Sequence, residues 1–103
     1  MLKDYMMLDL SPTNGRKSFY GNAKVVIVGN DKFLYSYDTP VAALLMRDGQ
    51  QFVHRLWDGR SATTTSHIKA WLYTTGLQAK GCSVKAFYDL PLTDIADIEG
   101  MED

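Results

Sequence analysis

The sequence predicts an α+β fold, in which an antiparallel β-sheet of four to six strands carries one main α-helix packed on a face. Short segments rich in β-branched and aromatic residues are separated by turn dipeptides, which is typical of antiparallel strands. A longer segment, residues 63–75, repeats its apolar residues at helical spacing. At 103 residues the chain has room for one sizeable hydrophobic core, so we expect a single domain.

A first pair of strands is expected in the first half of the chain. Residues 25–28 read VVIV, a continuous β-branched run of the kind found in strands that are buried on both faces. The following Gly29-Asn30-Asp31 has the chemistry of a hairpin turn. Residues 33–37, FLYSY, then form the returning strand, which includes Tyr35 and Tyr37.

A second hairpin is predicted by Asp48-Gly49, a strong turn signal that joins residues 41–46 to residues 51–57. The run VAALLM at 41–46 is also compatible with a helical turn. Pro40 lacks the N–H that a ladder needs, so we place it at a sheet edge or at a bend between strand segments. In the second strand, one face carries Phe52, His54 and Leu56, and the other carries Val53, Arg55 and Trp57.

The ends of the chain divide the domain into three parts. Residues 1–17 form a variable N-terminal segment whose apolar residues pack as an edge strand or a short helix. Residues 18–88 form the sheet-plus-helix core, with a last strand at 82–88 that Pro91 terminates. Residues 89–103 form an acidic C-terminal tail, either frayed or folded as a short helix with Ile95, Ile98 and Met101 on one side.

Charge is distributed unevenly between the body and the tail. The last 15 residues hold six acidic residues and no Lys or Arg, whereas the rest of the chain holds 11 basic and six acidic residues. Solubility is the simplest role for such a tail, and contact with a basic face or mimicry of nucleic-acid phosphate are the alternatives. Apolar runs are shorter than the roughly 18 residues of a membrane span, and the start does not resemble a signal peptide. We therefore expect a cytoplasmic protein without a membrane partner.

Metal, cofactor and catalytic signatures are weak. The single Cys82 cannot form an internal disulfide, and together with His54 and His67 it lacks the paired spacing of a zinc site. There is no glycine-rich phosphate loop, EF-hand or Walker pattern. No nucleophile, base and orienting group occur together. The sequence predicts no metal, no cofactor and no enzymatic activity.

The stretch LWDGRSATTTSHI, residues 56–68, connects the last hairpin strand to the helix. Asp58-Gly59 is expected to reverse the chain through a residue with positive φ. Ser61, Thr63 and Thr64 are hydroxyl residues suited to cap a helix that begins near them. With Arg60 and the free N–H groups of the first turn, they would form an anion-binding concavity within reach of His67, although capping alone explains the same composition.

The helix that follows is expected to end at Gly76, with Leu77 making the hydrophobic contact that accompanies a glycine cap. Its apolar stripe consists of Ile68, Trp71 and Leu72. This stripe predicts packing on the sheet and leaves His67 nearer the flank of the helix.

Three blocks of the chain resemble a family signature. They are SFYGNA (18–23), YSYDTPVA (35–42) and RLWDGRSATTTSHIKAWL (55–72). Together they are similar to the pattern of a family of short uncharacterised proteins and domains found in bacteriophages and mobile elements. The resemblance implies a biological setting and no mechanism. It emphasises polar and aromatic positions: Tyr35, Tyr37, Thr39, Trp57, Ser61, Thr63, Thr64 and His67.

We expect a small non-enzymatic binding protein that occupies a host protein or protein complex, as an inhibitor of a host defence system would. One alternative is a module that holds a nucleotide or other phosphate compound at residues 60–67. Another is a nucleic-acid-binding protein, because the body is positively charged and rich in aromatic residues. A homodimer through an exposed sheet edge is a further expectation. The candidate ligand- or partner-binding residues are Trp57, Arg60, Ser61, Thr63, Thr64, His67, Tyr35 and Tyr37.

Overall fold

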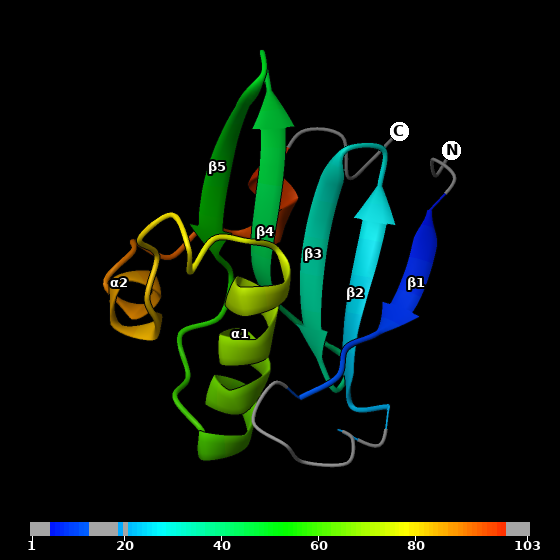
Figure 1. Ribbon diagram of the computed structural model, residues 1–103, viewed down its shortest axis with the longest axis vertical. Helices are drawn as coiled ribbons and strands as arrows, with labels where there is room; N and C mark the ends of the chain where they lie inside the picture. Colours follow the sequence, from blue (N-terminus) through cyan, green and yellow to red (C-terminus); the bar gives the residue numbers. More distant parts are fainter. Residues whose placement is uncertain (1–4, 13–18, 20, 99–103) are drawn as a thin grey trace.

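The protein is an antiparallel five-stranded sheet whose strands lie side by side in chain order, with one main helix across a face, in a computed structural model (Figure 1). The predicted α+β class is confirmed. The structure describes residues 5–12, 19 and 21–98. The strands are β1 (Met6–Asp9), β2 (Ala23–Val28), β3 (Asp31–Ser36), β4 (Thr39–Arg47) and β5 (Gln50–Arg55). The helices are α1 (Ala62–Thr74), α2 (Val84–Tyr88) and the short 3₁₀ helix η1 (Ile95–Asp97).

Tight turns connect β2 to β5 in sequence. Asp48 and Gly49 join β4 to β5 with φ values of 55° and 80°, as expected for a two-residue hairpin loop. Gly29 opens the β2–β3 turn with a φ of 62°. The prediction that Tyr37 lies in the returning strand is wrong. Because Ser36 pairs with Thr39, Tyr37 belongs to the β3–β4 turn, where its φ is 58°.

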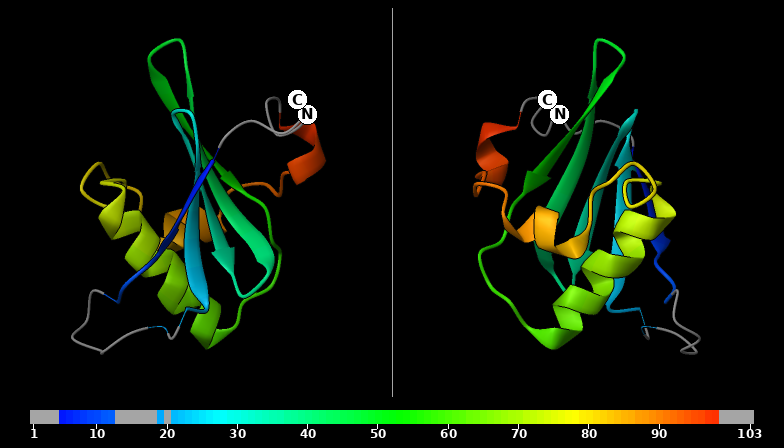
Figure 2. Two further views of the ribbon diagram at one scale, coloured as in Figure 1. Left: turned by 90° about the vertical axis from the view of Figure 1, so that its right-hand side faces the viewer. Right: turned by 60° about the vertical axis from the view of Figure 1, so that its left-hand side comes forward.

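Both faces of the sheet are covered, as the VVIV run of β2 predicts. Val25 and Ile27 face the cluster beneath α1, whereas Val26 and Val28 face a second cluster on the opposite side. Viewed from the β1 edge, α1 lies on one side of the sheet and η1 on the other (Figure 2, left). The strand therefore contributes alternate residues to two different cores.

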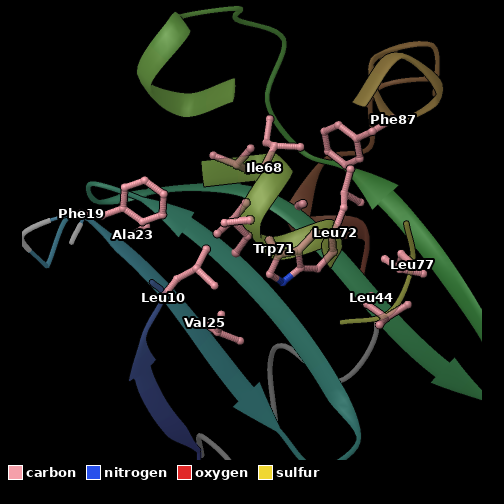
Figure 3. Close-up of a cluster of buried hydrophobic side chains, with 14 of the residues drawn as sticks. Leu10, Phe19, Ala23, Val25, Leu44, Ile68, Trp71, Leu72, Leu77 and Phe87 are labelled. Atoms are coloured by element: carbon pink, nitrogen blue, oxygen red, sulfur yellow. The ribbon is translucent and has the colours of Figure 1, made fainter. Parts of the chain in front are cut away.

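The larger core lies between α1 and the sheet, with α2 against its side (Figure 3). Trp71 and Ile68 are fully buried there, and Leu77 just beyond the helix is buried as predicted. The indole N–H of Trp71 has no hydrogen-bond partner within the described part of the chain, so this ring is held by packing. His67 is 1% exposed, which corrects its predicted position on the helix flank.

The smaller core lies on the opposite face, where the C-terminal segment returns to the sheet. Ile98 is buried against Phe33 and Leu45, and Ile95 packs beside it. The Thr93 N–H donates to the Arg55 carbonyl at 2.8 Å, which fixes the segment to the end of β5. The predicted short helix exists as η1, and Met101 lies outside the described residues.

The predicted strand at 82–88 is wrong, because this segment contains helix α2. Ser83 accepts a hydrogen bond from the Ala86 N–H and caps the helix. Phe87 and Tyr88 are buried and Val84 is half-buried, a spacing that suits one helical face. The alternation of apolar residues with Lys85 suggested a strand because the segment is too short to distinguish the strand period from the helix period.

The two edges of the sheet differ. β1 forms one edge, which confirms the edge-strand alternative for the N-terminal segment. β5 forms the other, and its last residue Arg55 bridges to Leu92 of the C-terminal segment. Among the described residues, no helix combines the length and the apolar character needed to cross a membrane.

Candidate functional site

The junction between β3 and α1 holds a buried polar network. The Ser36 Oγ lies 3.0 Å from the Thr64 Oγ1 and 2.8 Å from the His67 Nδ1. All three residues are at most 5% exposed. Thr64 and His67 are three positions apart on α1, so both point from the same helical face toward the end of β3. We call Ser36, Thr64 and His67 the junction network.

Local structure places the helix so that this network can form. Ser61 is the N-cap of α1, and its side chain accepts a hydrogen bond from the Thr64 N–H at 3.0 Å. This cap fixes the first turn and so the position of Thr64. The sequence predicted the start of the helix correctly, to within two residues.

Aromatic rings enclose His67. The Phe19 ring meets it edge to face with a centroid separation of 4.5 Å, and the Tyr37 ring lies 5.9 Å away. Burial lowers the pKa of His67, so the imidazole is neutral at pH 7. A neutral imidazole has one N–H donor and one acceptor nitrogen, which suits a hydrogen bond with a hydroxyl.

The Ser36–His67 pair has the contact distance of a nucleophile and its base, but not the accessibility. Ser36 is 3% exposed and His67 is 1% exposed, so a substrate cannot reach either group in this conformation. The third member of the network, the Thr64 hydroxyl, contacts Ser36, whereas the carboxylate of a catalytic triad bonds and orients the histidine. The arrangement fits a buried hydrogen-bond network that fixes the helix against the sheet.

A second set of contacts anchors the segment before α1 to α2. The Arg60 guanidinium lies 4.4 Å from the centre of the Tyr88 ring. The Tyr88 hydroxyl hydrogen-bonds the Thr65 hydroxyl at 2.7 Å, and Arg55 donates to the Tyr88 carbonyl at 2.9 Å. Tyr88 therefore connects α1, α2 and β5.

The anion-binding concavity predicted at residues 60–64 lacks most of its free groups. The Ser61 hydroxyl caps the helix, the Thr64 hydroxyl belongs to the junction network, and Arg60 stacks on an aromatic ring. Thr63 keeps an exposed side chain. Within the described residues, no three His, Cys, Asp or Glu side chains gather as a metal site would require.

The predicted role of Asp58-Gly59 is wrong, because Gly59 does not adopt a positive φ. A different contact favours glycine there. The Trp57 ring lies over the Gly59 backbone, and a Cβ at that position would overlap the ring. Close side-chain approach, and not chain reversal, explains this glycine.

The remaining predicted site residues lie apart from the junction network. Trp57 is half-buried against the core beneath α1, and Tyr35 is half-buried on the opposite face of the sheet. Burial raises the pKa of Tyr35. The exposed members of the predicted set are Tyr37, Arg60, Ser61 and Thr63.

Sequence reasoning missed two residues that organise this region. Ser36 lies inside the YSYDTPVA block, and a small polar residue among strand aromatics was the available signal. Tyr88 was assigned to a strand, so its connection to the helix start was hidden. Both contacts join residues more than 20 positions apart, which local patterns do not report.

These features define a class: a small α+β protein whose sheet and helix are joined by a buried hydroxyl–imidazole network. The chain belongs to a family of unknown function, DUF8033, whose profile matches residues 6–89, from β1 to the end of α2. No curated protein matches the chain significantly. No solved structure does so either.

Proposed function

We propose that this protein is a non-enzymatic binding protein of the phage or mobile-element type, acting in the host cytoplasm. Its partner is a host protein or protein complex, and its effect is inhibition, most directly of a defence system. The three sequence blocks that resemble the phage-associated signature support the setting. The conformation of Tyr37, near the start of the second of these blocks, supports the binding role.

Tyr37 is the single observation that carries the proposal. Its backbone has a φ of 58°, in the left-handed region that costs a non-glycine residue about 1–3 kcal/mol. Its side chain is nevertheless 52% exposed, so burial of the ring offsets only part of that cost. Strained residues of this kind concentrate at functional positions.

The surroundings hold this tyrosine in place. Its N–H donates to the Asn22 carbonyl at 2.6 Å, and its ring lies against the buried His67. A preorganised, exposed aromatic side chain loses little entropy on binding and is typical of the central residues of protein interfaces. The junction network thus supports a binding residue without taking part in chemistry.

The exposed residues at the start of α1 supply polar contacts near the same sheet-to-helix junction. Arg60, Ser61 and Thr63 are exposed. Arginine beside aromatic residues is common at protein interfaces, where polar groups form the rim. These three residues are the second part of the proposed partner-binding surface.

The alternative functions have less support from the geometry. A phosphate ligand at residues 60–67 would have to displace the contacts that Arg60 and Thr64 already make. A nucleic-acid-binding surface needs exposed rings for base stacking, whereas the aromatic residues Phe19 and Trp71 are buried. Protein binding through Tyr37 requires neither change.

The test is affinity capture from host lysate with two tyrosine variants. Tyr37→Asn removes the ring while keeping a residue that tolerates the left-handed conformation. Tyr73→Asn is the matched control, because Tyr73 is 64% exposed on α1 and away from the turn. We expect the same host protein with wild type and Tyr73→Asn, and its loss with Tyr37→Asn. Retention by Tyr37→Asn, or turnover of a substrate by the purified protein, would contradict the proposal.

A further inference from the structure

Strand β1 differs from the other strands because all of its residues are exposed. The exposed fractions of Tyr5, Met6, Met7 and Leu8 are 58%, 57%, 50% and 47%. Within the described residues, the outer side of β1 pairs with no strand. Edge strands are usually protected by charged residues, proline or bulges, and residues 5–8 contain none of these. We propose that a second copy of this chain pairs with β1 in antiparallel fashion, about a two-fold axis that passes between the two Met7 residues. This interaction surface is independent of the Tyr37 surface.

The direction of the backbone groups selects the register. The Leu10 N–H donates to the Ala23 carbonyl, so Leu10, and by alternation Leu8 and Met6, direct their backbone groups toward β2. The backbone groups of Tyr5, Met7 and Asp9 then point to the free side. In a two-fold pairing centred on Met7, Met7 faces Met7 of the second copy, and Tyr5 faces Asp9 of the second copy.

This register uses every outward-pointing backbone group of residues 5–9. It forms three hydrogen-bonded pairs, of residues 5 with 9, 7 with 7 and 9 with 5, and each such pair exchanges two N–H···O bonds. Registers centred on Met6 or Leu8 form only two such pairs within residues 5–9. Among residues 5–9, the Met7-centred pairing therefore satisfies the most backbone groups.

The side chains agree with the same register. Met6 and Leu8 lie on the α1 face of the sheet because they pair with Ile27 and Val25. The proposed axis is perpendicular to the sheet, so each Met6 meets Leu8 of the second copy on that face. On the other face Met7 meets Met7. No like charges oppose each other, because Asp9 faces Tyr5 and is already paired with Lys24 at 2.9 Å.

The opposite edge of the sheet favours a closed pair over a longer assembly. The Arg55 end of β5 is occupied by Leu92 and Thr93. The rest of that edge begins with the polar Gln50 and Gln51, and among its residues Phe52 is an exposed apolar side chain, at 44%. Among the described residues, the exposed run Tyr5 to Leu8 makes the β1 edge the more apolar of the two. A two-fold pairing uses that edge in both copies and stops at a dimer.

Charge reversal at the axis tests the register. We expect the full-length protein to sediment as a dimer, and Met7→Lys and Met7→Glu, each alone, to sediment as monomers, because two like charges meet at the axis. Mixing these two variants should restore a dimer that contains one copy of each. Tyr73→Lys, an equally drastic change on α1, should leave the wild-type dimer unchanged. Thermal melting of each variant establishes that it remains folded.

Cross-linking provides a second measurement that does not depend on affinity alone. In a Cys82→Ser background, Met7→Cys should form an intermolecular disulfide under mild oxidation, since hydrogen-bonded antiparallel pairs have Cα atoms about 5.5 Å apart. Leu8→Cys is the matched control, because Leu8 faces Met6 of the second copy and not itself. A monomeric wild type at about 1 mM, a failure of the mixed charge variants to pair, or equal cross-linking through residues 7 and 8 would overturn the proposal.

Discussion

Replacing Ser36 with alanine tests whether the junction network holds α1 on the sheet. The Ser36 hydroxyl contacts both the Thr64 hydroxyl and the His67 imidazole. Its removal leaves two buried polar groups without this partner, and a buried unsatisfied group costs about 1–3 kcal/mol. Thr64 can recover part of its loss by bonding a carbonyl of the preceding helical turn. We therefore expect a total loss of about 2–3 kcal/mol in the free energy of unfolding.

Urea and thermal unfolding measure this loss. For a domain of this size, 1 kcal/mol corresponds to about 4–8 °C in Tm, so Ser36→Ala should lower Tm by on the order of 10–20 °C. Ser66→Ala is the matched control, because the Ser66 hydroxyl donates to the Ala62 carbonyl on the surface of the same helix. Its effect should stay within about 0.5 kcal/mol.

A double-mutant cycle separates the network from simple loss of packing. Ser36→Ala and Thr64→Val should together cost less than the sum of their separate effects, with a coupling energy of about 0.5–3 kcal/mol. A change in stability below about 0.5 kcal/mol for Ser36→Ala, or full additivity with Thr64→Val, would refute the structural role given to the network.

Three further outcomes are expected. Burial lowers the folded-state pKa of His67. The stability that the neutral imidazole contributes is therefore complete above the unfolded-state pKa of about 6.5, and it is lost as the pH falls through the folded-state pKa. Urea unfolding between pH 7.5 and 5.5 should show this loss in wild type and in His54→Gln, but not in His67→Gln. Gly59→Ala should displace the Trp57 ring, which a changed tryptophan emission spectrum and a lower Tm would reveal, and an unchanged spectrum would argue against the close approach. Burial raises the pKa of the half-buried Cys82 thiol, so alkylation at pH 7.5 should be slower in the folded protein than in urea, with equal rates contradicting that environment.

The sequence predicted those parts of the fold that depend on neighbouring residues. Asp48-Gly49 specified a hairpin because both of its residues tolerate positive φ. Ser61 marked the helix start because its hydroxyl can accept a first-turn N–H. Each of these features is decided within a few positions of the chain.

Contacts between segments that are distant in the sequence could not be predicted from local residue patterns. Phe87 and Tyr88 were assigned to a strand because a five-residue helix shows too little periodicity to be recognised. Tyr37 was placed in a strand because an aromatic residue favours strands, whereas the Ser36–Thr39 pairing requires it in the turn.

The same distinction between local features and long-range contacts applies to the candidate site. The sequence identified Thr64 and His67, but only the fold brings both of them to the buried Ser36 hydroxyl.

The agreement between strand order and chain order has a consequence for folding. Each of β3 to β5 pairs with the strand just before it across a tight turn, so these pairings close only short loops and cost little entropy. During synthesis the sheet can assemble by residue 55, before α1 is complete. Its α1 face would then remain uncovered until Ile68, Trp71 and Leu72 have left the ribosome. The sheet is therefore most vulnerable to aggregation during the interval in which its helix is still being made.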